Sequence, residues 1–341
     1  MLFELDRTAD VPHFPATAQS FFPRGPTEFP GLARARRIQF MPLQIVHHPD
    51  YDAGFATNHR FPMSKYPLLM DALRARGLAG RDTLNTAEPA PASWLELAHA
   101  ADYVAQVISC SVPEKIEREI GFPVTPRVSL RAQLAAGGTM LAARLALRHG
   151  IACNTAGGSH HARRAQGAGF CTFNDVAVAA LVLLAEGSAQ NILVVDLDVH
   201  QGDGTADILA DDPRVFTFSM HGDRNYPVRK IASDLDVALP DGTDDAAYME
   251  RLAAILPDLS AQAHWDIVFY NAGVDVHAED RLGRLALSDD GLRARDDMVI
   301  SHFRTQGIPV CGVIGGGYST DVPALAARHA ILFEVASGYA R

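Results

Sequence analysis

Apolar positions along the chain alternate between short continuous runs and longer stretches with helical spacing. The short apolar runs predict buried strands near 43–47, 151–154, 191–197, 214–219, 235–239, 266–271 and 308–314. The stretches with helical spacing predict helices near 65–76, 93–108, 131–149, 175–186, 244–259, 288–305 and 321–335. Strands that are apolar throughout and separated by helices form sheets covered on both faces. The sequence therefore predicts an α/β fold, a single domain whose mainly parallel β-sheet is flanked by helices on both faces.

Helix-ending residues support several of these assignments. Asn174 is a good N-cap for the helix 175–186, and glycines follow the helices 65–76, 131–149 and 175–186. Two adjacent glycines inside the helix 131–149, Gly137 and Gly138, weaken it locally. We expect them to allow the close approach of another helix.

The regular pattern starts only at Met41, so residues 41–341 form the predicted globular domain. Residues 1–40 are rich in Pro, Phe and Arg and have no periodicity. We interpret them as an N-terminal extension, either the product of an upstream start codon, a disordered arm, or a segment that packs on a partner subunit.

Composition excludes several classes of function. The chain has 341 residues, 48% apolar and 21% charged, as is usual for soluble globular proteins. Its net charge is −10 and it contains no dense basic run, which argues against nucleic-acid binding. A negative surface favours cationic substrates such as lysine-rich peptides or polyamines. There is no apolar stretch of 18 residues, and the four cysteines form no Cys-x-x-Cys pair. We expect a cytoplasmic protein without membrane partners, its oligomeric state open.

The segment 196–205, Asp-Leu-Asp-Val-His-Gln-Gly-Asp-Gly-Thr, directly follows an apolar strand. Ligands in open α/β sheets bind beyond the carboxyl ends of strands. Asp198 and His200 are two residues apart, so in extended backbone their side chains point the same way. This pattern indicates two ligands of one metal ion. The alternative is a helix N-cap beside a polar strand end.

Three other strand ends also carry reactive groups. A Gly-Gly turn after the strand 151–154 precedes His160 and His161, two adjacent imidazoles that both need partners. Asp275 follows the strand 266–271, and Gly-Gly-Gly-Tyr, ending at Tyr318, follows the strand 308–314. The tyrosine is either a mobile hydroxyl donor or an aromatic lid on the sheet edge.

These segments, in this order, resemble the zinc-dependent histone deacetylase superfamily, which has the arginase/deacetylase fold. The resemblance runs from about Gln44 to beyond Tyr318 and rests on the paired His, Asp-x-Asp-x-His-x-Gly-x-Gly-Thr, Ala-Gly-x-Asp and Gly-Gly-Gly-Tyr. Within the superfamily, the segments 59–63 and 270–273 resemble class IV-like and related bacterial deacetylase-like amidohydrolases.

The resemblance implies a metal centre. Its ligands would be Asp198, His200 and Asp275, holding one Zn²⁺, with Fe²⁺ as the alternative. The resemblance also implies a structural K⁺ ion near Asp196 and Ser219.

The catalytic groups implied by the resemblance lie beside that metal. His160 would be oriented by Asp196 and His161 by Asp203. His161 would then act as general base and His160 mainly as an electrostatic stabiliser. Tyr318 would donate its hydroxyl to the oxyanion.

The resemblance further implies the walls of a substrate channel. Phe170 and Tyr226 would flank the acyl-lysine stem, and the Gly169 carbonyl would accept the acyl amide N–H. Leu282 would lie near the channel mouth or floor. Arg60 would lie behind the metal, in the pocket that receives the released acid, unless it forms a surface salt bridge instead.

The chain departs from the family pattern at three places. Gln201 replaces a second histidine, which we interpret as a subtype feature. Ser159 replaces a large aromatic residue, so we expect a larger cavity behind the metal and tolerance of acyl groups longer than acetyl. The segment 99–123 offers no clear acidic residue to hold a peptide backbone.

The expected function is therefore zinc-dependent removal of an acyl group, most simply acetyl, from an acyl-lysine side chain of a protein or peptide. Two alternatives remain open: a deacylase of small acylated amines such as acetylpolyamines, and a non-catalytic acyl-lysine binding module. A two-metal enzyme of the arginase type is disfavoured, because His277 stands where a further aspartate would be needed after Asp275.

Overall fold

The computed structural model describes residues 42–340. The predicted N-terminal extension, residues 1–40, lies outside the described residues. Across residues 42–340, no helix combines the length and the apolarity needed to span a bilayer.

Eight strands form one sheet in which every pair of neighbours is parallel. The strands are β1 (Gln44–His47), β2 (Leu84–Thr86), β3 (Ile151–Asn154), β4 (Ile192–Asp196), β5 (Val215–Gly222), β6 (Leu235–Leu239), β7 (Ile267–Asn271) and β8 (Val310–Val313). Their order in the sheet is β2-β1-β3-β8-β7-β4-β5-β6. This sheet confirms the predicted fold class. The edge strand β2 was not predicted, because its three residues are only partly buried or exposed and carry no apolar run.

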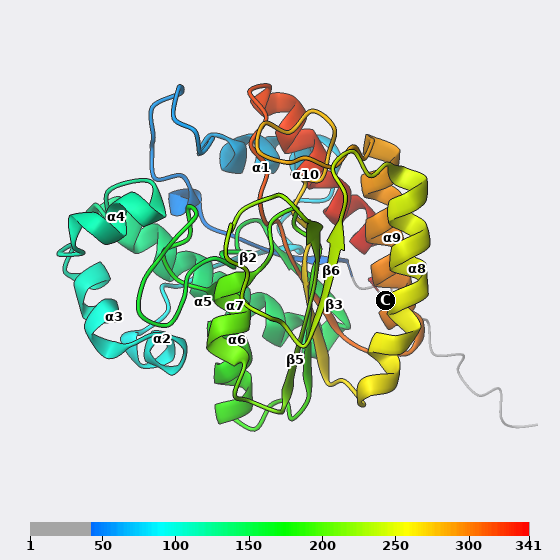
Figure 1. The fold of residues 1–341 in the computed structure, drawn as a ribbon, viewed down its shortest axis with the longest axis horizontal. Helices are drawn as coiled ribbons and strands as arrows, with labels where there is room; N and C mark the ends of the chain where they lie inside the picture. Colours follow the sequence, from blue (N-terminus) through cyan, green and yellow to red (C-terminus); the bar gives the residue numbers. More distant parts are fainter. Residues whose placement is uncertain (1–41, 341) are drawn as a thin grey trace, which may run out of the picture. The chain divides into compact units, whose positions relative to one another are not determined.

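Helices cover both faces of the sheet (Figure 1). They are α1 (Lys65–Ala75), α2 (Ala92–Ala98), α3 (Ala101–Ile108), α4 (Glu114–Ile120), α5 (Pro126–His149), α6 (Asp175–Ala185), α7 (Asp203–Leu209), α8 (Asp245–Gln262), α9 (Asp289–Thr305) and α10 (Val322–Ser337), with a 3₁₀ turn at Pro49–Tyr51. Helices α5 and α6 pack together on one face, where α2 also contacts α6. On the other face α1, α10, α9 and α8 pack in succession. The buried apolar side chains of the sheet and of the helices packed on it form the hydrophobic core.

The predicted helix 93–108 is two helices, α2 and α3, which separate at His99. The His99 ring bonds to the Arg163 carbonyl at 2.9 Å and accepts the Asn174 backbone N–H at 2.9 Å. These contacts to distant segments hold His99 in an extended conformation, which ends α2. The periodicity of the segment contained no sign of them.

The two glycines in α5 face a loop and a tyrosine, so the expectation of a neighbouring helix was wrong. A Cβ atom on Gly137 would lie 1.9 Å from the carbonyl oxygen of Glu88, and one on Gly138 would lie 2.1 Å from the Tyr51 hydroxyl. Helix α5 also starts earlier than predicted, at Pro126, because the Thr125 hydroxyl accepts the Val128 N–H.

The strand order determines where the reactive segments meet. The four neighbouring strands β3, β8, β7 and β4 are those followed by the His-His, Gly-Gly-Gly-Tyr, Ala-Gly-x-Asp and Asp-x-Asp-x-His segments. Asn154 and Asn271 pair with Val313, and Asp196 pairs with Asn271, so the four strands end level with one another. All four segments therefore emerge side by side at one edge of the sheet.

Candidate metal centre and active site

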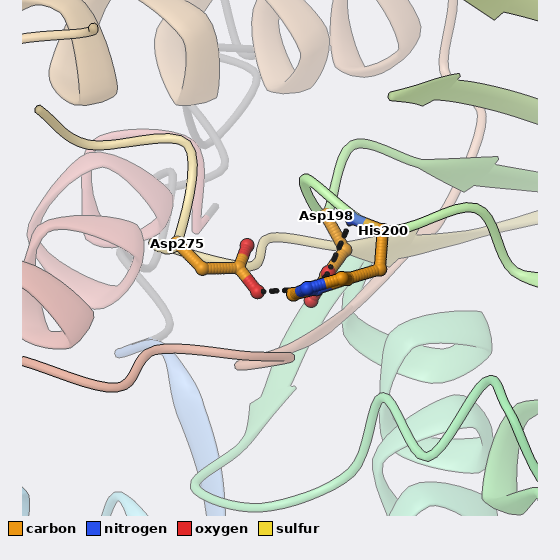
Figure 2. A group of neighbouring side chains, drawn as sticks. All are labelled: Asp198, His200 and Asp275. Atoms are coloured by element: carbon orange, nitrogen blue, oxygen red, sulfur yellow. Dashed lines mark hydrogen bonds and ion pairs between the residues drawn. The ribbon is translucent and has the colours of Figure 1, made fainter. Parts of the chain in front are cut away.

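Asp198, His200 and Asp275 bring their ligand atoms together beyond β4 and β7 (Figure 2). The Nδ1 atom of His200 lies 3.1 Å from Asp198 Oδ1 and 3.1 Å from Asp275 Oδ2. All three residues are buried. The second oxygen of each carboxylate is held by a backbone N–H, from Gly316 to Asp198 at 2.7 Å and from Val199 to Asp275 at 2.9 Å. The loops thus fix the three side chains in one geometry.

The donor set fits a divalent cation. Two carboxylates and an imidazole suit Zn²⁺ or Fe²⁺. Burial, followed by the nearby charge of Asp198, raises the pKa of Asp275 to about 7. Two buried carboxylates that repel each other are stabilised when a cation binds between them. The backbone also leaves room for the carboxylates, because a Cβ on Gly273 would lie 2.4 Å from Asp198 Oδ2 and one on Gly316 would lie 2.1 Å from Asp275 Oδ2.

Two His–Asp pairs lie next to this cluster. His160 Nδ1 is 2.7 Å from Asp196 Oδ2, and His161 Nδ1 is 2.6 Å from Asp203 Oδ1. Asp203 is shared, because its Oδ2 accepts two N–H groups of Arg163. Burial, and then the charge of His160, lowers the pKa of His161 to about 4. For His160, burial is outweighed by Asp196 and by the neighbouring ligand carboxylate, which raise its pKa to about 9. At neutral pH the His161 ring is therefore the neutral one.

Asp196 is also bonded by Asn271 Nδ2 at 2.9 Å and by the backbone N–H of Asp198 at 3.1 Å. It pairs in register with Ser219 on the neighbouring strand β5. The Ser219 hydroxyl lies 3.0 Å from His221 Nδ1. A monovalent cation near Asp196 and Ser219 stays a prediction.

Tyr318 lies at the end of the Gly-Gly-Gly-Tyr loop, with only 7% of its surface exposed. Its ring centroid is 6.0 Å from that of His200 and 5.6 Å from that of Phe170. Its backbone N–H donates to Asp280 Oδ2 at 2.7 Å, which fixes the loop. Burial, followed by the charges of Asp198 and other nearby acids, raises the pKa of the phenol well above its usual value. The hydroxyl therefore stays protonated and can serve as a donor.

A pocket of about 450 Å³ opens onto these groups. Its lining includes three site residues, His161, His200 and Tyr318, and all four predicted wall residues, Gly169, Phe170, Tyr226 and Leu282. The Tyr226 ring stands perpendicular to that of His161 at 4.8 Å between centroids. Phe170 has a left-handed backbone, φ +67°, held where its N–H and that of Gly169 donate to carbonyl groups of α4. The sequence did not predict α4, yet this helix positions one wall.

A second cavity, of only about 20 Å³, shares Gly169, Phe170 and Tyr318 with the outer pocket and is also lined by His160; we call it the inner cavity. This volume holds roughly one water molecule. Ser159 lines the inner cavity, but it does not open a large space there, so the expected enlargement was wrong. The surrounding Phe61 and Arg131 side chains also line the cavity.

The position expected for Arg60 was also wrong. Arg60 is exposed, lines the outer pocket and forms no ion pair with any residue in 42–340. The buried arginine of the inner cavity is Arg131, whose Nε donates to the Tyr51 carbonyl at 3.0 Å. Beside the Phe61 ring, at 5.0 Å, lies the ammonium of the fully buried Lys65. The sequence offered one signal for Arg131, a charged residue within an apolar helical stretch, and none for Lys65.

The model of the histone deacetylase domain matches residues 59–333. The chain belongs to the histone deacetylase family. It is 48% identical over 296 residues to an uncharacterized protein of Picosynechococcus sp., covering 87% of this chain and 99% of that protein. It is 31% identical over 290 residues to histone deacetylase 2 of Arabidopsis thaliana, covering 81% and 74% of the two chains. The crystal structure of an HDAC homolog from Aquifex aeolicus superposes with a TM-score of 0.73 at 26% identity, covering 87% of this chain and 84% of that one. The chain is thus a deacetylase-like member of this hydrolase family, with a buried Asp–His–Asp metal site.

Proposed function

We propose that this protein is a zinc-dependent amidohydrolase that removes an acetyl group from an acylated amine, above all an acyl-lysine side chain. The observation that carries the proposal is the meeting of the Asp198, His200 and Asp275 cluster with two His–Asp pairs and a tyrosine. His200, His161 and Tyr318 from this assembly line one open pocket. A divalent metal bound by that cluster polarises an amide carbonyl and acidifies water.

The protein groups divide the remaining chemistry. His161 lines the outer pocket, and its protonated Nδ1 donates a hydrogen bond to Asp203. Its Nε2 is therefore free to take a proton from water and return it to the leaving amine. His160 lines the inner cavity and, paired with Asp196, contributes positive charge. The Tyr318 hydroxyl donates to the negative charge that develops on the carbonyl oxygen. Phe170 and Tyr226 exclude water around the methylene stem.

The inner cavity supports a short acyl group. A volume of about 20 Å³ leaves no room for a chain longer than acetyl unless Phe61 or Arg131 moves.

Removing the hydroxyl of an oxyanion donor typically lowers the rate about 10²–10³-fold.

The test is hydrolysis of an acetyl-lysine peptide by zinc-loaded protein, with Tyr318→Phe and a chelator in parallel. We expect turnover that the chelator abolishes and that Tyr318→Phe lowers about 10²–10³-fold while its zinc content is unchanged. Binding of the peptide without any hydrolysis by the zinc-loaded protein would instead identify a non-catalytic acyl-lysine binding module. Faster turnover of an acetylated polyamine than of any peptide would identify a deacylase of small amines.

A further inference from the structure

We propose that the substrate carries negatively charged groups next to its acyl-bearing chain. This inference rests on the proposed function and specifies the substrate class for that same pocket. It reverses the expectation drawn from the net charge of the chain, which favoured cationic peptides and polyamines.

Four exposed arginines line the outer pocket that leads to the metal cluster. They come from four separate segments: Arg60 from the loop before α1, Arg118 from α4, Arg224 from the loop after β5, and Arg284 from the loop after β7. One carboxylate, Glu119, lies in the same lining. We call these four arginines the cationic rim.

The ion pairs of the cationic rim do not neutralise it. Asp241 is shared by two arginines, lying 3.2 Å from Arg284 and 3.8 Å from Arg224. Arg118 pairs with Glu114, one helical turn away, at 2.8 Å, but both side chains are more than two-thirds exposed. Such exposed pairs are weak and exchange readily with a competing anion.

Arg60 has no ionic partner among residues 42–340. Even when every carboxylate that lines or pairs with the rim is counted, the four arginines outnumber them. The chain as a whole carries a net charge of −10, so the pocket mouth has the opposite sign from the rest of the protein.

Arginine is suited to bind carboxylates and phosphates, because its planar guanidinium donates two parallel hydrogen bonds to them. A positive rim attracts an anionic substrate and speeds its association, more strongly at low salt. A lysine-rich peptide or a polyamine brings like charges to the same place and is repelled. The rim therefore favours an acylated amine flanked by acidic residues, or a small acylated amine with its own carboxylate.

The experiment uses zinc-loaded protein and acetyl-lysine tripeptides that differ only in their flanking residues: aspartate, glutamine or lysine. Free Nε-acetyl-lysine and its carboxamide form the small-molecule arm, because they differ only by one carboxylate. Both kcat/KM and the dissociation constant of each probe are measured, at low and at high salt. We expect the acidic tripeptide to exceed the lysine tripeptide at least about tenfold in kcat/KM, with the ratio shrinking as salt rises.

Single variants show whether the rim is the cause. Arg60→Gln, Arg224→Gln and Arg284→Gln are each expected to lower the acidic-over-basic ratio roughly two- to fivefold, mainly through KM. Arg148→Gln is the matched control, because Arg148 is exposed in the last turn of α5, before the start of β3, and does not line the pocket. It should leave the ratio unchanged.

The outcomes separate this inference from the proposed function. Equal or better use of the lysine tripeptide, or a ratio that no rim variant alters, overturns the inference and leaves the hydrolase intact. If no probe is hydrolysed, the proposed function fails, and the dissociation constants of the same tripeptides still decide the inference. Tighter binding of the acidic tripeptide then supports it, and equal binding overturns it.

Discussion

Replacement of Asp203 by asparagine tests how the protein sets the tautomer of His161. The Asp203 carboxylate is fully buried and uses its two oxygens differently. Oδ1 lies 2.6 Å from His161 Nδ1, while Oδ2 accepts Arg163 Nε at 2.9 Å and also accepts Nη2 of the same guanidinium. Both oxygens therefore accept, and His161 carries its proton on Nδ1.

The asparagine amide has one oxygen and one NH₂ group, and Arg163 decides which way it turns. The guanidinium can only donate, so the amide oxygen must face Arg163 and the NH₂ group must face His161 Nδ1. The imidazole then accepts at Nδ1 and carries its proton on Nε2, where it cannot take a proton from water. Losing a general base lowers kcat about 10²–10⁴-fold, a barrier increase of roughly 3–5.5 kcal/mol. Weaker hydrogen bonds to an uncharged partner also lower the free energy of unfolding, by about 1–3 kcal/mol.

The assay is acetyl-lysine hydrolysis under saturating substrate, with zinc content and the melting temperature measured on the same sample. Asp207→Asn is the matched control, because Asp207 is an exposed carboxylate about one turn further along α7 that accepts the Arg164 backbone N–H and does not hydrogen-bond to His161. The control should keep normal kcat. If folded, zinc-loaded Asp203→Asn retains kcat within about threefold of the natural protein, the role given to His161 and its tautomer is refuted.

Three further changes test the metal centre, the packing of α5 and a buried histidine. Zinc at 100 times its dissociation constant should raise the free energy of unfolding by about 2.7 kcal/mol. If zinc raises the melting temperature of Asp275→Ala as much as that of the natural protein, Asp198, His200 and Asp275 are not the ligand set. Gly137→Ala should lower the free energy of unfolding by about 1–3 kcal/mol or more, because its Cβ would lie 1.9 Å from a carbonyl oxygen. In urea unfolding, Gly80→Ala is the control, since open space surrounds that position, and equal effects of the two variants would contradict the packing argument. Burial lowers the pKa of His99 from 6.5 to about 4. Between these two pH values the His99 ring binds a proton in the unfolded chain and stays neutral in the folded chain. Stability should therefore fall by up to about 1.4 kcal/mol per pH unit between pH 6.5 and 4. As the pH falls from 6.5 to 4, the difference in unfolding free energy between the natural protein and His99→Gln should shrink. A difference that stays constant would argue against a buried neutral His99.

Much of the fold followed from local pattern. Seven of the strands and the ends of several helices were predicted, because apolar runs, N-caps such as Asn174 and glycine stops such as Gly150 act within a few residues. The elements that the sequence missed are short or shaped by distant contacts. The separation of α2 from α3 depends on bonds from His99 to segments more than 60 residues away.

The metal ligands could also be proposed from the sequence, because Asp198 and His200 lie two residues apart just after one strand and Asp275 follows another. That these strand ends lie next to each other is a property of the strand order, β3-β8-β7-β4, which no local pattern contains. The same is true of the Arg163 bond to Asp203, which joins segments 40 residues apart.

The sequence by itself determined the α/β class, the positions of seven strands and the chemical groups at their ends, since each depends on near neighbours along the chain. Only the tertiary structure decided that Arg131 rather than Arg60 lies in the inner cavity, and that four arginines meet at the pocket mouth. Net charge is a sum over the whole chain, here −10, whereas a substrate responds to the charges closest to it. Which charges those are depends on how distant segments pack, and packing is set by the fold as a whole.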